Sequence, residues 1–151
     1  GAMIYGALGM ANNWKKFVEA ESKVVELKRL CCIDKTPKNT ESYFIGKTLR
    51  WMKQNSDYDL VVSYADTYYG HEGTIYKASN FKHMGLTTKG KVIDYNERYY
   101  HDKCFRTYYT NKDGEKVIKP FAQKIKGALE TGEAKYVEMP EKHIYIYSLK
   151  G

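Results

Sequence analysis

The sequence has few of the residues and motifs that mark specialised classes of protein. Its 3 Cys, 3 Pro and 12 Gly among 151 residues exclude a collagen-like or low-complexity chain. No apolar run is long enough for a membrane helix or a signal peptide. Because C-x-x-C, H-E-x-x-H and Cys/His boxes are absent, no structural zinc site is expected. We expect Cys31, Cys32 and Cys104 to be buried free thiols in a reducing cytoplasm.

Positive charge and tyrosine are what the sequence has in excess. Its 25 Lys and Arg against 18 Asp and Glu give a net charge of +7 and a pI near 9.1. This balance favours an anionic partner such as nucleic acid or a phosphorylated cofactor, and a basic protein without such a partner is the alternative. The 15 Tyr supply rings that pack or stack on bases and hydroxyls that donate protons.

The apolar pattern predicts one α/β (α+β) domain with a mixed central sheet flanked by helices. Predicted strands cover residues 3–8, 24–33, 59–65, 91–96, 103–110, 115–118 and 143–149, and predicted helices cover 41–54, 73–79 and 120–129. The strands at 24–33 and 59–65 are expected to be parallel and joined by the first helix. We assign the cofactor-binding and catalytic core to residues 1–88 and further strands and a helix to 89–151, within one domain over 1–151.

The start of the helix at 41–54 is a candidate phosphate site. Lys35 and Lys38 flank the loop before it, and Asn39 or Thr40 can cap its first turn. Unpaired N–H groups and a partial positive charge at a helix N-terminus favour an anion. An ordinary capped helix start is the alternative. The Ser42 hydroxyl faces such a ligand or bonds to the backbone.

A second candidate site follows the strand at 59–65. Asp66 ends this strand, and Tyr76 lies in the middle of the next helix. Carboxyl ends of strands are where α/β sheets place their chemistry, so both side chains are expected to face a cavity where the parallel strands diverge. The alternative is that Asp66 anchors the loop and Tyr76 packs in the core.

The helix at 73–79 resembles part of the GCN5-related acyltransferase (GNAT) superfamily. Tyr76-x-x-x-Asn80-Phe81 is similar to its Tyr-x-x-x-Gly-Phe motif, with Asn80 at the position that needs a left-handed backbone. The resemblance implies that Tyr76 protonates a departing thiolate and that acetyl-CoA or a related CoA thioester binds Lys35, Lys38, Asn39, Thr40 and Asn80. The chain lacks the glycines of the usual pyrophosphate loop. Residues 1–3 are either the remnant of an expression tag or natural sequence, and the strand and helices that usually begin the fold are expected to be missing.

A resemblance that covers most of the chain is to the phage Mom family. It is carried by the strings ELKRLCCID, PKNTESYFI, VVSYAD, GHEGTIYKASNF, GLT and KHIYIY, in that order. The resemblance implies a site containing Arg29, Ser42, Asp66 and Tyr76, with His71 in the same matched segment. It also implies carbamoylmethylation of the adenine N6 amine in DNA, which protects phage DNA from host restriction in the host cytoplasm.

Three functions are compatible with these features. In the first, the chain modifies double-stranded DNA, flips adenine out of the helix and contacts it through His71, Tyr99 and Tyr100. Further aromatic and basic residues that could contact DNA are Tyr108, Tyr109 and the lysines at 116, 119, 124 and 126. The second is an N-acetyltransferase acting on a protein or small amine, and the third is a non-enzymatic DNA-binding module. The donor, any metal requirement, the DNA context and the oligomeric state, a dimer included, are left open.

Overall fold

A five-stranded mixed sheet forms the centre of the part of the chain that carries the candidate site. The computed structural model describes residues 1–9 and 12–151. The sheet consists of β1 (Ala2–Gly6), β2 (Val24–Cys31), β3 (Leu60–Asp66), β4 (Lys82–Leu86) and β10 (Lys142–Ser148), in the order β1-β2-β3-β10-β4. Strands β2 and β3 are parallel and their other neighbours are antiparallel, which confirms the predicted fold class and the predicted parallel pair.

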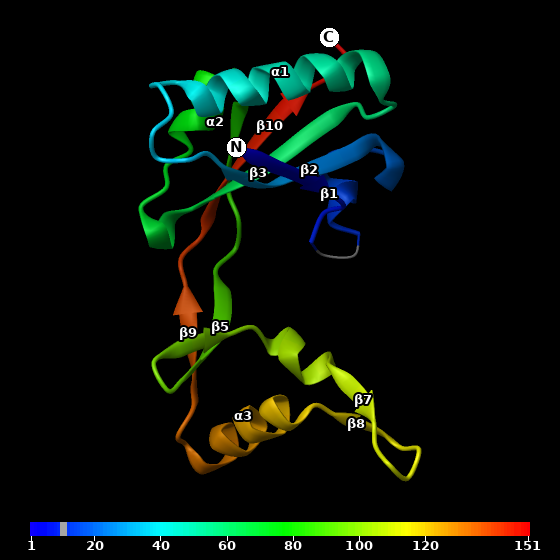
Figure 1. Ribbon diagram of the computed structural model, residues 1–151, viewed down its shortest axis with the longest axis vertical. Helices are drawn as coiled ribbons and strands as arrows, with labels where there is room; N and C mark the ends of the chain where they lie inside the picture. The colour runs from blue at the N-terminus through cyan, green and yellow to red at the C-terminus, as the bar shows by residue number, and fades with distance from the viewer. Residues whose placement is uncertain (10–11) are drawn as a thin grey trace. The chain divides into compact units, whose positions relative to one another are not determined.

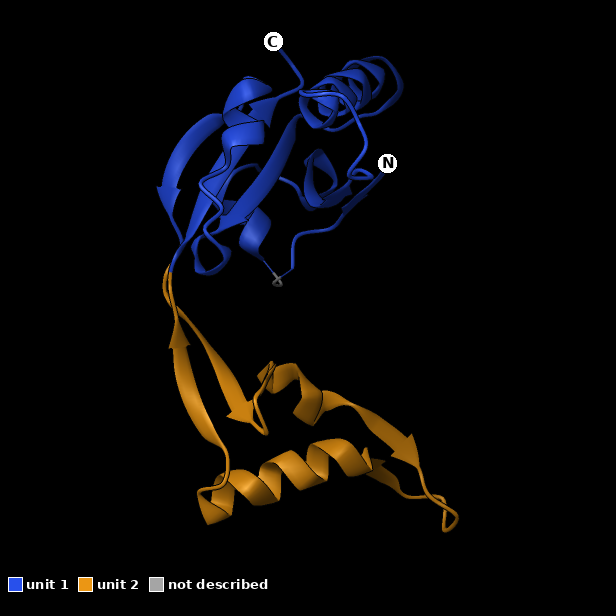
Figure 2. Ribbon diagram, turned by 60° about the vertical axis from the view of Figure 1, so that its left-hand side comes forward, with its two compact units in different colours: residues 1–87, 141–151 blue, residues 88–140 orange. Residues whose placement is uncertain are grey.

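This sheet belongs to one of two compact units in the chain. Residues 1–87 and 141–151 form the first unit, and residues 88–140 form the second (Figure 2). The last strand of the sheet, β10, therefore returns to the first unit, although the sequence analysis grouped it with residues 89–151. The single domain over 1–151 stays a prediction.

Helix α1 (Thr40–Asn55) packs on the sheet of the first unit (Figure 1). Ile45, Leu49 and Met52 recur at helical spacing and are buried against Val25 and Val61. Each such burial contributes about 1.5–3 kcal/mol. The apolar stripe thus fixes both the helix and the face that it presents to the sheet.

The prediction that a side chain caps the first turn of α1 is wrong. Asn39 occupies the cap position with φ of 68°, and its side chain makes no capping hydrogen bond. The Thr40 hydroxyl instead donates to the Pro37 carbonyl at 2.6 Å, which closes the turn that leads into the helix. The left-handed backbone of Asn39 replaces the extended conformation that a capping side chain needs.

The short helix α2 (Thr74–Ala78) ends as its sequence predicts. Asn80 has φ of 62°, the left-handed conformation. The Phe81 N–H then donates to the Tyr76 carbonyl at 3.0 Å, and the Phe81 side chain is buried. This reversal leads directly into β4 and keeps Tyr76 at the centre of the helix.

Strands β2 and β3 stay together only at their first residues. Their ladder joins Val24–Glu26 to Leu60–Val62, and β2 then continues beside β1. Beyond the ladder, the buried Ser63 hydroxyl donates to the Leu27 carbonyl at 3.1 Å. A β-bulge beside Ile4 leaves Lys28 without a partner in β1, and bulges bend a strand locally. The two strands therefore open a gap in the middle of the sheet.

The second unit has its own small core. Strands β5 (Gly90–Tyr95), β6 (Arg98–Tyr100) and β9 (Lys135–Met139) form an antiparallel sheet in the order β6-β5-β9. Helix α3 (Pro120–Thr131) buries Ile125 and Ala128 against Ile93. The hairpin of β7 (Tyr108–Thr110) and β8 (Lys116–Ile118) precedes α3 and turns at Asn111–Gly114, as predicted.

Two expectations about this chain are corrected by the structure. The strand predicted over 103–110 is wrong: residues 102–106 form a 3-10 helix and only Tyr108–Thr110 is a strand. The His101 Nδ1 atom accepts the Lys103 N–H at 3.1 Å and starts this turn, so Cys104 and Phe105 both pack on the second core. The cysteines are not buried, since Cys31 is exposed and the others are half-buried.

Candidate active site

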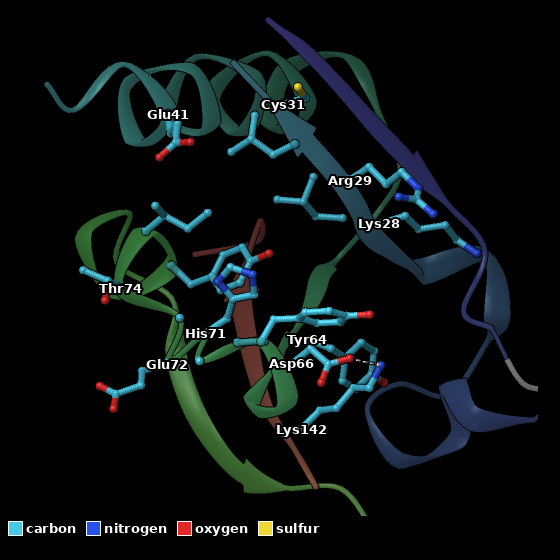
Figure 3. A pocket seen from close by; sticks show the side chains of 18 of the residues that line it. Lys28, Arg29, Cys31, Glu41, Tyr64, Asp66, His71, Glu72, Thr74 and Lys142 are labelled. Atoms are coloured by element: carbon cyan, nitrogen blue, oxygen red, sulfur yellow. Dashed lines mark ion pairs between the residues drawn. The ribbon is translucent and has the colours of Figure 1, made fainter. Parts of the chain in front are cut away.

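A cavity of about 970 Å³ lies where β2 and β3 diverge (Figure 3). We call it the main cavity. Its wall is formed by Glu26–Cys31 of β2, Glu41 of α1, Tyr64–Asp66 of β3, the loop and helix residues 69–76, and Lys142 of β10. The gap in the sheet is therefore the source of the cavity, as the sequence analysis expected of the diverging strands.

Four of the predicted site residues line the main cavity. Arg29, Asp66, His71 and Tyr76 come from β2, β3, the loop after β3 and α2. Figure 3 shows Arg29 beside Lys28, both on β2 and pointing the same way. Two adjacent strand residues usually point to opposite faces, so the bulge at Lys28 accounts for the shared direction of these two side chains, and both residues line the main cavity.

Asp66 holds the loop that covers one side of the main cavity. Its Oδ1 atom accepts the Tyr68 N–H at 3.1 Å, and its Oδ2 atom forms an ion pair with Lys142 at 2.8 Å (Figure 3). The Asp66 carbonyl accepts the His71 N–H at 3.2 Å. These contacts match the alternative in which Asp66 anchors the loop, and its catalytic role stays a prediction.

Gly73 allows this loop to lie against the sheet. It has φ of 73°, and a Cβ atom at this position would lie 2.2 Å from the Tyr145 ring. The Tyr145 hydroxyl donates to the Glu72 carbonyl at 2.6 Å. A residue other than glycine would push the loop away from β10, so the start of α2 and the place of Tyr76 depend on Gly73.

Tyr76 lies between two aromatic rings and lines the main cavity. Its ring centre is 5.5 Å from that of Phe81 and 5.4 Å from that of Tyr145. Burial raises the pKa of Tyr76, a hydrogen bond with the Ser63 side chain offsets part of this effect, and the Glu26 carboxylate adds to it. Tyr76 is therefore fully protonated at neutral pH and available as a hydrogen-bond and proton donor.

The remaining predicted residues lie outside this wall. A second cavity of about 430 Å³ is lined by Lys38, Asn39, Thr40 and Ser42 at the start of α1. Glu41, Thr74 and Ile75 line both cavities, so the two are adjacent. Ser42 donates to the Asn39 carbonyl at 3.0 Å.

Lys35 and Asn80 line neither cavity. Tyr99 and Tyr100 belong to the second unit. There Tyr99 is 47% exposed, whereas Tyr100 packs on the core of that unit. The described residues hold no group of three or more His, Cys, Asp and Glu that could bind a metal ion.

Several residues that line the main cavity were not predicted from the sequence, among them Glu26, Tyr64, Tyr69 and Lys142. Glu26 gave a signal, because it is a carboxylate inside an otherwise apolar stretch, VVEL. Tyr69 gave a weaker one, as an aromatic residue in a short loop after a strand. Lys142 reaches the site because β10 pairs with β3 in a register that sets Lys142 opposite Asp66, and no local pattern reveals that pairing.

None of the helices in the described residues is long and apolar enough to cross a membrane. Among curated proteins, no sequence matches the chain significantly. A family model does match, over residues 1–151, and it describes the Mom protein family. Since the match covers the whole chain, this protein belongs to the Mom protein family.

Proposed function

We propose that this protein transfers a carbamoylmethyl group to the N6 amine of adenine in double-stranded phage DNA. Membership of the Mom family supports the proposal. The observation that carries it is that Arg29, Asp66, His71 and Tyr76, from four parts of the chain, line one cavity. The GNAT-like nature of the fold, and action in the host cytoplasm during infection, belong to the same proposal.

The main cavity is large enough for a nucleobase. Small-molecule sites have volumes of roughly 300–1,000 Å³, and this one measures about 970 Å³. Chemistry on adenine N6 requires the base to leave the duplex and enter a pocket. Tyr69 lines this cavity with 68% of its surface exposed, and base–aromatic stacking is worth roughly 1–3 kcal/mol. Tyr69 is therefore our candidate for stacking on the flipped base.

The chemical roles follow from charge and protonation. Tyr76 keeps its proton at neutral pH, so it can donate that proton to a leaving group. Lys28, Arg29 and Lys142 add positive charge to the wall, which favours DNA phosphate near the entrance. Asp66 holds Lys142 at this wall and can still accept a hydrogen bond, since a carboxylate offers about four lone-pair sites.

A CoA thioester is the donor that the GNAT resemblance implies, and it would lie in the second cavity at the start of α1. The residues there fit its pyrophosphate poorly. Lys38 and the first-turn N–H groups favour an anion, but Asp34 and Glu41 also line this cavity. Lys35 does not line it. We therefore assign no step of the reaction to a bound CoA thioester.

The proposal is tested by mass spectrometry of the nucleosides digested from plasmid DNA of cells that express the protein. We expect a carbamoylmethyl-sized mass increase on adenine with the wild-type chain. Tyr76→Phe and Asp66→Asn should each lower the rate of adenine modification by about 10²–10⁴-fold, because each removes a positioned proton-transfer or charged group. The modified fraction of adenine should fall accordingly. Removing the Tyr76 hydroxyl should cost only about 1 kcal/mol of stability.

Tyr136→Phe is the matched control, because that side chain lies in the second unit and is 55% exposed. It should modify DNA like the wild type. Unmodified adenine together with acetylation of an amine substrate would favour the N-acetyltransferase alternative. Unmodified DNA with retained DNA binding would favour a non-enzymatic module.

A further inference from the structure

Glu26 is a carboxylate on the wall of the main cavity with unused hydrogen-bonding capacity. It lies on β2 at the last rung of the ladder with β3, opposite Val62. Its Oε2 atom is shielded from solvent and has no hydrogen-bond partner among residues 1–9 and 12–151. The neighbouring residues Val25 and Leu27 are buried in the core, so the backbone at Glu26 is held in place.

A shielded carboxylate oxygen without a donor is unusual in a folded protein. Nine-tenths or more of buried polar groups have a partner, and an ionised carboxylate can only accept. An N–H donor that enters the main cavity would supply the missing partner. Glu26 is half-buried and lines the main cavity, so a small rotation of its side chain would present the carboxylate to such a donor.

Asp66, a second carboxylate at this wall, is already engaged. Asp66 accepts the Tyr68 N–H and pairs with Lys142. Glu26 instead lines the same cavity with its Oε2 atom unpartnered within the described residues. Its negative charge contributes to the raised pKa of both Tyr64 and Tyr76, which shows that the carboxylate lies within electrostatic range of both rings.

We propose that Glu26 binds the substrate by accepting a hydrogen bond from an exocyclic amino group. This inference rests on the proposed function, in which that group is the N6 amine of the flipped adenine. A carboxylate attracts the amino group of adenine and repels the carbonyl oxygen that guanine carries at the same ring position. Glu26 is then a residue that selects adenine, with Tyr76 on the same wall as the proton donor.

The test compares two DNA duplexes that differ by one amino group. Each is a G/C duplex with one variable base placed opposite an abasic site, which lowers the cost of flipping that base. The variable base is adenine in one duplex and purine, which lacks the amino group, in the other. Dissociation constants are measured for the wild-type chain, Glu26→Ala, Glu26→Gln and the control Glu21→Gln.

We expect the wild-type chain and Glu21→Gln to bind the adenine duplex about tenfold or more tightly than the purine duplex, as for a hydrogen bond to a charged group. Glu21 is an exposed residue of the 3-10 helix before β2 and does not line the main cavity. Glu26→Ala should bind both duplexes equally. Glu26→Gln should lose most of the preference, because the amide is neutral.

Folding of the variants is checked by the ultraviolet titration of tyrosine. Loss of the Glu26 charge should lower the pKa of Tyr64 and Tyr76, and Glu26→Gln should melt at or above the wild-type temperature. The inference is overturned if Glu26→Ala keeps the wild-type preference, or if the wild type has none. If the wild type binds neither duplex, the proposed function is refuted, and this inference with it.

Discussion

At the scale of single residues, three partly buried tyrosines of the first unit, Tyr5, Tyr64 and Tyr76, hold their protons tightly. Tyr5 bonds to the Thr48 hydroxyl at 2.7 Å, and Tyr64 accepts the Asn13 amide at 3.3 Å. Burial is the main cause of a raised pKa at Tyr5, Tyr64 and Tyr76. The folded protein therefore keeps these three protons to a higher pH than the unfolded chain does.

This difference predicts a loss of stability in alkali. Below about pH 10, both states hold the tyrosine protons and the free energy of unfolding does not depend on them. Above about pH 10, the unfolded chain releases protons that the folded protein retains, so stability falls with rising pH, by up to about 1.4 kcal/mol per pH unit for each such group. Denaturant unfolding at pH 9 to 11 measures the slope.

The same measurement on variants identifies the groups responsible. Tyr64→Phe and Tyr76→Phe should each make the fall shallower, because each removes one retained proton. The exposed Tyr136→Phe should leave the slope as in the wild type. A wild-type slope in both buried variants would contradict the assignment.

Sequence patterns predicted some site residues and missed others for a clear reason. The position of Asp66 at the cavity was predicted from a strand end, and the left-handed conformation of Asn80 from a helix end, because both depend on local sequence. Lys142 is separated from Asp66 by the whole second unit, and their ion pair depends on the register of β10. Glu26 was missed because a lone carboxylate in an apolar strand identifies neither its neighbours nor the cavity beside it.

At the scale of elements, the start of α1 is the feature that most directly tests the donor. Its first-turn N–H groups favour an anion, whereas Glu41 lines the same cavity and opposes one. We expect CoA to shift NMR resonances between residues 34 and 43. Glu41→Gln should tighten CoA binding and Lys38→Gln should weaken it, each by roughly two- to fivefold, since a charge beside a helix end is worth about 0.3–1 kcal/mol.

Lys47→Gln is the control for this prediction, because it lies on α1 outside both cavities. It should bind CoA like the wild type. Shifts confined to residues outside 34–43 would show that the donor binds elsewhere.

Helices were easier to predict than strands because their signal is local. The apolar residues of α1 and α3 recur at helical spacing, and both helices were predicted to within a few residues. Strands β4, β6 and β9 were not predicted. β4 exposes four of its five residues and β6 has three residues, so neither shows an alternating apolar face. Their partners β10 and β5 define them, and pairing between distant segments cannot be read from local sequence.

At the scale of the whole molecule, the chain divides its proposed work between two units. The first holds both cavities at the site, and the second carries exposed aromatic and basic residues. In the second unit, Tyr99, Tyr108, Tyr109 and Phe121 are exposed, and Lys116 lies over the Tyr108 ring. Exposed lysines beside exposed rings are typical of surfaces that bind nucleic acid. We therefore expect the second unit to supply sequence-independent affinity for DNA.

Replacing Lys116, Lys119, Lys124 and Lys126 together by Gln should weaken DNA binding and reduce its salt dependence. These four lysines are exposed and lie on β8, at the cap of α3 and on α3. Each lost phosphate contact lowers the slope of log K against log salt by about 0.9, and this is measured by titrating DNA at several salt concentrations. The control replaces Lys15, Lys16, Lys47 and Lys53 of the first unit by Gln, which changes net charge by the same amount. Equal losses in both variants would mean that total charge, and not the second unit, determines the affinity. If the two units have separate roles, only the variant at Lys116, Lys119, Lys124 and Lys126 should bind DNA more weakly. The DNA that this variant still binds should be modified.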